Sequence, residues 1–201
     1  MAYRSGDDFT VLVVCTGNVC RSPAIERLFR SAFGSAGITV HSAGTGALIG
    51  EPIQPPMARL LEERGVDGGS FAARQVTEEQ VDSADIILTA TREHRAAVVE
   101  QVPSAIRRTF TVREFARLVD RVDPVRLDVA AGPGGPPAKR FAALVPLAAA
   151  ERAQVDPELD NIVDPYRRSD AVYQESFGQI IEAVRSIVRV VLGVPAQESA
   201  R

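Results

Sequence analysis

The feature that most constrains the fold of this chain is its alternation of short apolar segments with amphipathic ones. Four segments rich in β-branched and other apolar residues, at 9–15, 37–41, 85–89 and 107–112, predict strands. Residues with helical apolar spacing follow each of them, and the last such segment, 172–188, predicts a long amphipathic helix. Shorter helices are predicted to start near Thr77 and at Thr91. Because strands joined through helices pair in parallel, the sequence predicts an α/β fold with helices on both faces of a parallel sheet.

Length and charge limit what kind of protein this is. The 201 residues suit one domain, spanning 1–201. The formal net charge of −3 argues against nucleic-acid binding, and no polybasic run predicts a membrane surface. The N-terminus lacks the apolar stretch of a signal peptide, and the longest apolar patch is about half of the roughly 20 residues that a transmembrane helix needs. We therefore expect a cytoplasmic protein without a membrane segment, and the sequence leaves its oligomeric state open.

One region departs from the alternation. Residues from about 120 to 160 are rich in Pro, Ala and Gly, with AGPGGPPAKR near the centre. This composition predicts a flexible insertion that carries one helix, Phe141 to Gln154. A surface insertion without a functional role is favoured over a lid that covers a site.

The stretch VCTGNVCRSP, after the first predicted strand, combines a thiol with an anion-binding loop. Cys15 ends the strand at the carboxyl edge of the sheet, where folds of this class bind ligands. The loop enters a helix N-terminus with free N–H groups, Gly17 is expected to supply a positive φ that makes them converge, and Arg21 can hold two phosphate oxygens. The same field favours the Cys15 thiolate. The loop therefore predicts attack on phosphorus through a cysteinyl-phosphate intermediate.

This chemistry also needs a carboxylic acid above the loop. Asp123, Asp156 and Asp164 each precede a proline, which restrains an aspartate to extended geometry. The first two lie in or beside the irregular region, whereas Asp164 lies in NIVDPYRRSDAVY, just before the last helix. We expect Asp164 to protonate the leaving oxygen and then to activate water.

Other classes of site fit the residues less well. Four residues separate Cys15 from Cys20, whereas thiol redox motifs usually have two between their cysteines. His41 and His94 have no ligand spacing to these thiols, so no metal site is expected. His41 is predicted to lie in a strand, and His94 on an exposed helix face from which it could reach the rim of the site. A module that only binds phosphoproteins is the non-enzyme alternative, which the nucleophile, clamp and acid together disfavour.

With these motifs the sequence resembles the low-molecular-weight protein tyrosine phosphatase family, in particular its bacterial branch, which includes protein-arginine phosphatases. VCTGNVCRSP carries the resemblance, and HSAGTG, ADIILTATREHR and VDPY support it. The similarity covers most of 9–193 except the insertion. It implies a four-stranded parallel sheet of the phosphatase I-like type, a phosphorylated protein as substrate, and no metal or cofactor.

The resemblance also implies roles for individual residues. Cys15 would be the nucleophile, Arg21 the phosphate clamp and Asp164 the acid and then the base. Asn18 would hold the loop in shape with Ser42 as its partner. The remaining loop residues expected around the phosphate are Thr16, Gly17, Val19, Cys20 and Ser22.

Two of these loop residues have further implied roles. Ser22 would donate a hydrogen bond to the Cys15 sulfur. Cys20 would form a reversible disulfide with Cys15 that protects it from overoxidation, while a purely structural role as a small buried hydrophobe is about equally well supported.

The sequence departs from the family pattern at two places. Ala90 and Thr91 stand where members often carry Met-Asp, and Arg167 and Arg168 stand where many have two glycines. Solvated surface charges are the favoured interpretation of the two arginines, and a preference for acidic substrates is the alternative.

The substrate is predicted from the walls of the site. Tyr166 and Leu48 are expected to flank the slot as apolar walls, which suits phosphotyrosine. Arginine phosphatases of the family use a threonine at the position of Val19, whose side chain lacks the hydroxyl. Phosphotyrosine is therefore favoured over phosphoarginine, and arsenate reduction is ranked lower because Cys20 is the sole additional thiol.

Overall fold

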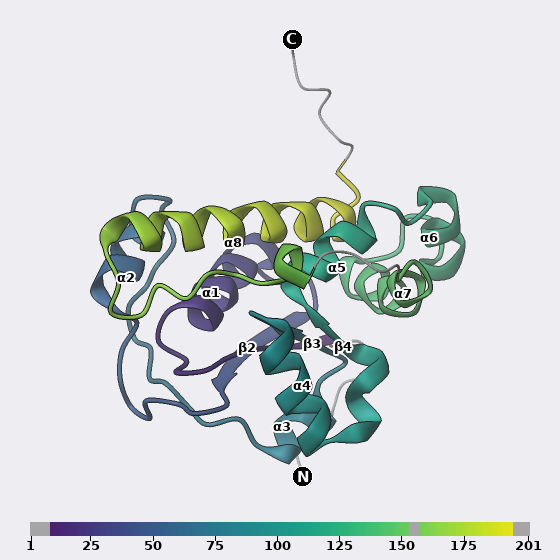
Figure 1. Ribbon diagram of the computed structural model, residues 1–201. Helices are drawn as coiled ribbons and strands as arrows, with labels where there is room; N and C mark the ends of the chain where they lie inside the picture. Colours follow the sequence, from purple (N-terminus) through teal and green to yellow (C-terminus); the bar gives the residue numbers. More distant parts are fainter. Residues whose placement is uncertain (1–8, 153–156, 195–201) are drawn as a thin grey trace.

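A four-stranded parallel sheet forms the centre of the molecule. The computed structural model describes residues 9–152 and 157–194 (Figure 1). The strands are β1 (Phe9–Cys15), β2 (Ile38–Gly44), β3 (Ile86–Thr89) and β4 (Thr109–Thr111), in the spatial order β2-β1-β3-β4. All three pairings are parallel, which confirms the predicted sheet.

Helices cover both faces of this sheet, as predicted (Figure 1). On β1, Val11 and Val13 join the larger apolar cluster, whereas Leu12 and Val14 join a smaller one on the opposite face. The larger cluster includes residues of α1 (Arg21–Phe33), α2 (Pro55–Glu62), α5 (Val112–Val119) and α8 (Asp170–Val191). The smaller includes residues of α3 (Glu78–Ser83), α4 (Arg92–Gln101) and the 3₁₀ helix η1 (Pro103–Arg108). Burial of alternate strand residues on opposite faces therefore holds the sheet between two helical layers.

Threonine side chains begin three of the helices. Thr77 accepts a hydrogen bond from the Gln80 amide, and Thr111 accepts one from the Glu114 amide; both pairs form complete capping boxes. Thr91 caps α4 in the same way, and the sequence predicted helix starts at Thr77 and Thr91. The caps at Thr91 and Thr111 fix the points at which the chain leaves the carboxyl ends of β3 and β4.

The region 120–160 is more ordered in secondary structure than the sequence predicted. It contains two helices, α6 (Pro124–Ala131) and α7 (Pro137–Ala150), and a short η2 (Pro157–Asp160), where the sequence predicted one helix, Phe141 to Gln154; Gln154 lies outside the described residues. The Phe141 ring is fully buried and lies 4.8 Å from that of Phe9 and 5.9 Å from those of Phe33 and Phe115. α7 overlaps the predicted helix, whereas the glycine- and proline-rich composition hid α6. Whether any of the insertion is flexible stays a prediction.

Among the described residues, none of the helices is both long and apolar enough to span a lipid bilayer.

Candidate active site

A cavity of about 190 Å³ opens where β1 ends and α1 begins. Residues from the first loop, the loop after β2 and the segment before α8 line it together: Cys15, Thr16, Gly17, Val19, Cys20, Arg21, Gly46, Leu48, Asp164 and Tyr166. The cavity thus lies at the carboxyl edge of the parallel sheet, as expected for this fold class. The structure brings together the predicted nucleophile, clamp, acid and both wall residues.

Asn18 determines the shape of the first loop. Its side chain is fully buried, and its Nδ2 donates to Ser22 Oγ and to Ser42 Oγ, both at 2.9 Å. Its Oδ1 accepts the Arg74 amide at 2.9 Å. The φ of Asn18 is +54°, so the left-handed turn lies here and not at Gly17, where the sequence predicted it. Asparagine tolerates this conformation better than other non-glycine residues, and its three hydrogen bonds hold it there.

Gly44, at the end of β2, is required by the close approach of the first loop. A Cβ atom at this position would lie 2.2 Å from the carbonyl oxygen of Thr16, a separation that real structures do not tolerate. Gly44, the first glycine of HSAGTG, therefore allows the backbone of β2 to pass directly beside the loop.

Glu26 is a buried support that sequence reasoning missed. Its carboxylate is 1% exposed and accepts Ser42 Oγ at 2.5 Å, Arg30 Nη1 at 3.1 Å and Arg74 Nη2 at 3.5 Å. Because Ser42 also accepts from Asn18, Glu26 stabilises the loop through one intermediate hydroxyl. Its position on α1, one turn beyond Ser22, was the available signal, but a glutamate on a helix is more often exposed.

The Cys15 sulfur lies at the bottom of the cavity, next to a hydroxyl. Its Sγ is 3.0 Å from Ser22 Oγ, and Cys15 is 2% exposed. The N-terminus of α1 has no side-chain cap, and the backbone amides of residues 17–22 form no hydrogen bond to another described residue. These free donors and the helix dipole make the loop suited to bind an anion such as phosphate.

Arg21 contributes a guanidinium that is buried and only partly satisfied. Its Nη2 lies 2.8 Å from Asp164 Oδ2, and its Nη1 donates to the Ile162 carbonyl at 3.4 Å. Its Nε is buried and has no hydrogen-bond partner among the described residues. A buried donor left unpaired is costly, so the geometry fits an oxyanion that accepts from this nitrogen.

Asp164 and Tyr166 form the outer side of the cavity. The Asp164 side chain is 54% exposed, and its Oδ1 accepts the Tyr166 amide at 3.2 Å. The Arg167 guanidinium lies over the Tyr166 ring, 5.1 Å from its centroid, a cation–π contact that restrains this ring. Leu48, also partly exposed, lines the same cavity. Both predicted wall residues therefore border the entrance to Cys15.

Cys20 lies on the inner side of the loop. Its Sγ is 3.7 Å from the Tyr173 hydroxyl, and burial raises the pKa of its thiol to about 12. Tyr173 packs in the core, and burial also raises the pKa of its hydroxyl. Cys20 is thus a neutral thiol at neutral pH, and a disulfide between Cys15 and Cys20 stays a prediction.

His94 is buried, contrary to the prediction that it lies on an exposed helix face. It is 7% exposed; its Nε2 lies 2.8 Å from Thr16 Oγ1, and its Nδ1 lies 2.7 Å from Thr91 Oγ1. Burial, and secondarily the charge of Arg21, lowers its pKa to about 4, so the ring is neutral at neutral pH. His94 therefore connects the cap of α4 to the first loop. The contact agrees with the prediction that His94 could reach the rim of the site, since Thr16, 78 residues away in the chain, lines the cavity.

Comparison with known proteins finds phosphatases of one family. Residues 10–132 match the family described as low molecular weight phosphotyrosine protein phosphatase. A probable low molecular weight protein-tyrosine-phosphatase of Ralstonia solanacearum, EpsP, is 37% identical over 117 residues, which are 58% of this chain and 79% of that protein. A protein-arginine-phosphatase of Geobacillus stearothermophilus is 33% identical over 128 residues, 64% of this chain and 81% of its own length.

Solved structures agree on the fold. The tyrosine phosphatase amsI of Erwinia amylovora superposes with a TM-score of 0.65 and 22% identity, covering 93% of this chain and 95% of that one. The arginine phosphatase YwlE of Geobacillus stearothermophilus also gives 0.65 and 22%, covering 96% of this chain and 99% of that one. At these identities the superpositions show a shared fold.

Proposed function

This chain belongs to the low molecular weight phosphotyrosine protein phosphatase family, and on that basis we propose that it hydrolyses phosphotyrosine in proteins through a phosphocysteine at Cys15. It is an enzyme of the protein phosphatase class, and its substrates are phosphorylated proteins. The observation that carries the proposed mechanism is the single cavity lined by Cys15, Arg21 and Asp164.

In the first proposed step, the substrate phosphate occupies the loop and Arg21 turns from Asp164 towards it. The free Nε of Arg21 and the free loop amides then donate to the phosphate oxygens. The Cys15 thiolate attacks phosphorus and forms an S–P bond, while the P–O bond to the substrate breaks. Asp164 gives its proton to the leaving phenolate oxygen, so the products of this step are a neutral phenol and phosphocysteine.

In the second step, water hydrolyses the phosphocysteine. The Asp164 carboxylate, now deprotonated, takes a proton from the water as its oxygen attacks phosphorus. The S–P bond breaks and the electron pair returns to sulfur, while inorganic phosphate leaves. Ser22, with its Oγ 3.0 Å from Cys15 Sγ, stabilises the departing thiolate by donating a hydrogen bond.

The walls of the cavity support phosphotyrosine as the substrate. Leu48 and Tyr166 border the opening, and apolar or aromatic surfaces pack favourably against a phenyl ring. The Val19 side chain also lines the cavity and carries no acceptor for the N–H groups of a phosphoarginine guanidinium. A buried donor without a partner would penalise phosphoarginine binding.

Arg167 and Arg168 support a secondary preference for acidic flanking residues. Arg167 stacks on the wall residue Tyr166, and Arg168 is exposed directly after it. Neither side chain forms an ion pair with another described residue. Cations at the rim attract a negatively charged peptide, with an effect that weakens as salt is added.

The test compares wild type with Cys15→Ala and Asp164→Ala on a chromogenic aryl phosphate. We expect Cys15→Ala to be inactive and Asp164→Ala to lose roughly 10²- to 10⁴-fold in kcat, the usual contribution of a general acid and base. Peptides with phosphotyrosine, phosphoserine or phosphoarginine, assayed beside arsenate with reductant, then decide the substrate. Full activity of Cys15→Ala would remove the mechanism, and faster turnover of phosphoarginine would replace phosphotyrosine as the substrate.

A further inference from the structure

Asp164 has few contacts of its own that could hold it in place. Its side chain is about half exposed, and its contacts are the Tyr166 amide and Arg21. In the proposed mechanism Arg21 binds the phosphate, so this ion pair is given up or shared when substrate enters. The position of the acid must therefore be set by the backbone that precedes it.

That backbone, the segment 160–163, is held by hydrogen bonds with helices α4, α5 and α8 and with the residue that follows β3. The Ile162 amide donates to the Ala90 carbonyl at 2.9 Å, and the Val163 amide donates to Gln179 Oε1 on α8 at 3.0 Å. Asn161 is held twice: its Oδ1 accepts the Arg92 amide at 3.0 Å, and its carbonyl accepts Arg113 Nη1 at 2.7 Å. Residues 161–163, which lie outside any helix or strand, are thus held at three consecutive positions.

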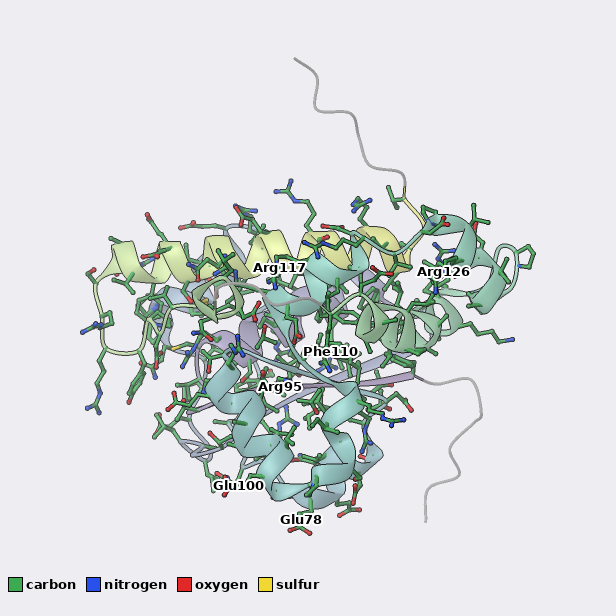
Figure 2. All side chains as sticks on the ribbon, turned by 45° about the vertical axis from the view of Figure 1, so that its right-hand side comes forward. Glu78, Arg95, Glu100, Phe110, Arg117 and Arg126 are labelled. Carbon is green, nitrogen blue, oxygen red and sulfur yellow. The ribbon has the colours of Figure 1, made fainter. Side chains whose placement is uncertain are left out.

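Asp160 provides the strongest of these attachments. It is 5% exposed, and its Oδ1 lies 2.6 Å from Arg117 Nη1 on α5, while its Oδ2 lies 3.8 Å from Arg92 Nη1 on α4. Figure 2 labels Arg117 on α5, which packs against α8. A buried carboxylate needs such partners, because an unpaired charge there would be costly.

We propose that Asp160, through Arg117, is a positioning residue for the general acid Asp164, with Asn161 and Arg113 as its second attachment. Asp160 is four residues before Asp164 and is the last residue of η2, so its ion pair sets the point from which the chain extends to the acid over the cavity. The inference rests on the proposed function, since it assigns an effect on proton transfer to residues that do not touch the substrate.

The experiment uses full-length protein and a series of aryl phosphates whose phenols differ in acidity. The parameter kcat/KM reports the step that forms phosphocysteine. In this step a good leaving group such as p-nitrophenolate needs little protonation, whereas a poor leaving group such as phenolate depends on a well-placed acid. We expect Asp160→Asn and Arg117→Met to lose about tenfold or more on phenyl phosphate but less than about threefold on p-nitrophenyl phosphate, since misplacement by about 1 Å costs up to roughly a hundredfold.

Arg189→Met is the matched control. Arg189 on α8 pairs at 2.5 Å with Asp120, the residue that ends α5, and neither residue forms a hydrogen bond or ion pair with the segment 160–163. This variant removes an arginine–aspartate pair of similar length from the same helix, α5, and we expect it to lower kcat/KM equally, or not at all, for every leaving group. Thermal unfolding of each variant confirms that the assayed protein is folded, and Arg117→Lys replaces any variant that is not.

The outcomes separate the two proposals. Asp164→Ala must show a steeper dependence of kcat/KM on leaving-group acidity; if it does not, the acid role in the proposed function fails. If Asp164→Ala is steeper while Asp160→Asn and Arg117→Met run parallel to wild type, the acid role stands and the positioning role is overturned.

Discussion

Replacing Asn18 with alanine tests how the first loop is held. The change removes three buried hydrogen bonds, to Ser22, Ser42 and the Arg74 amide. Each contributes about 1 kcal/mol net, and the Arg74 amide loses the partner that Asn18 supplies. Alanine at φ +54° adds about 1 kcal/mol of backbone strain. The sum is about 4 kcal/mol, or a fall in Tm of about 8–16 °C for a chain of this size.

Asn18→Gly separates the two contributions. Glycine accepts the positive φ without strain but makes none of the three side-chain hydrogen bonds, so we expect it to be about 1 kcal/mol more stable than Asn18→Ala. Both variants should lose about a hundredfold or more in kcat, because the amides and Ser22 are no longer preorganised. Circular dichroism melts and aryl phosphate kinetics measure the two effects. A Tm within about 2 °C of wild type with normal kcat would refute the assignment of loop shape to Asn18.

Three further predictions follow from particular contacts. His94 is buried neutral with a pKa of about 4, against 6.5 when unfolded, so the unfolded state binds more protons between these values. The contribution of His94 to the free energy of unfolding is therefore complete above pH 6.5 and is lost towards pH 4, by at most about 3 kcal/mol. Urea unfolding of wild type and of His94→Asn at several pH values should show that the variant lacks most of this decline. Val19→Thr should raise kcat/KM for phosphoarginine relative to phosphotyrosine peptides several-fold, about the value of one hydrogen bond, and an unchanged ratio would mean that Val19 does not select. Phe141→Ala should cost about 3–5 kcal/mol in urea unfolding, because its ring is fully buried among three others, whereas a loss below about 1 kcal/mol would mean that α7 is not part of the core.

Local sequence patterns were sufficient for much of the fold. The span 9–15 was predicted as a strand from its apolar, β-branched residues and is β1. Thr77 and Thr91 were predicted as helix starts because a threonine cap acts within three residues of itself. The loop from Cys15 to Ser22 was recognised because its residues are contiguous in the sequence and lead directly into the N-terminus of a helix.

What sequence reasoning missed depends on residues far apart in the chain. Glu26 is an ordinary helical glutamate until Ser42 and Arg74 enclose it. His94 is buried where its ring meets Thr16, which is 78 residues away in the chain. In both cases the burial of a polar side chain depends on partners that local periodicity does not reveal.

From the sequence, the positive φ of the loop was predicted at Gly17, because glycine is the usual residue in that conformation. In the structure Asn18 has the positive φ, and its side-chain hydrogen bonds stabilise it. The helix α6 was missed because the glycines and prolines around it are typical of loops. These errors arise where tertiary contacts override local preference.

Trapping the covalent intermediate tests the central claim most directly. Asp164→Ala, mixed with an aryl phosphate that has a good leaving group and quenched in acid, should accumulate phosphocysteine, because attack by Cys15 proceeds while the base for its hydrolysis is missing. Peptide mass spectrometry should place one phosphoryl group on Cys15, with none on Cys15→Ala treated in parallel. A phosphoryl group on any other residue, or steady turnover by Cys15→Ala, would contradict the account.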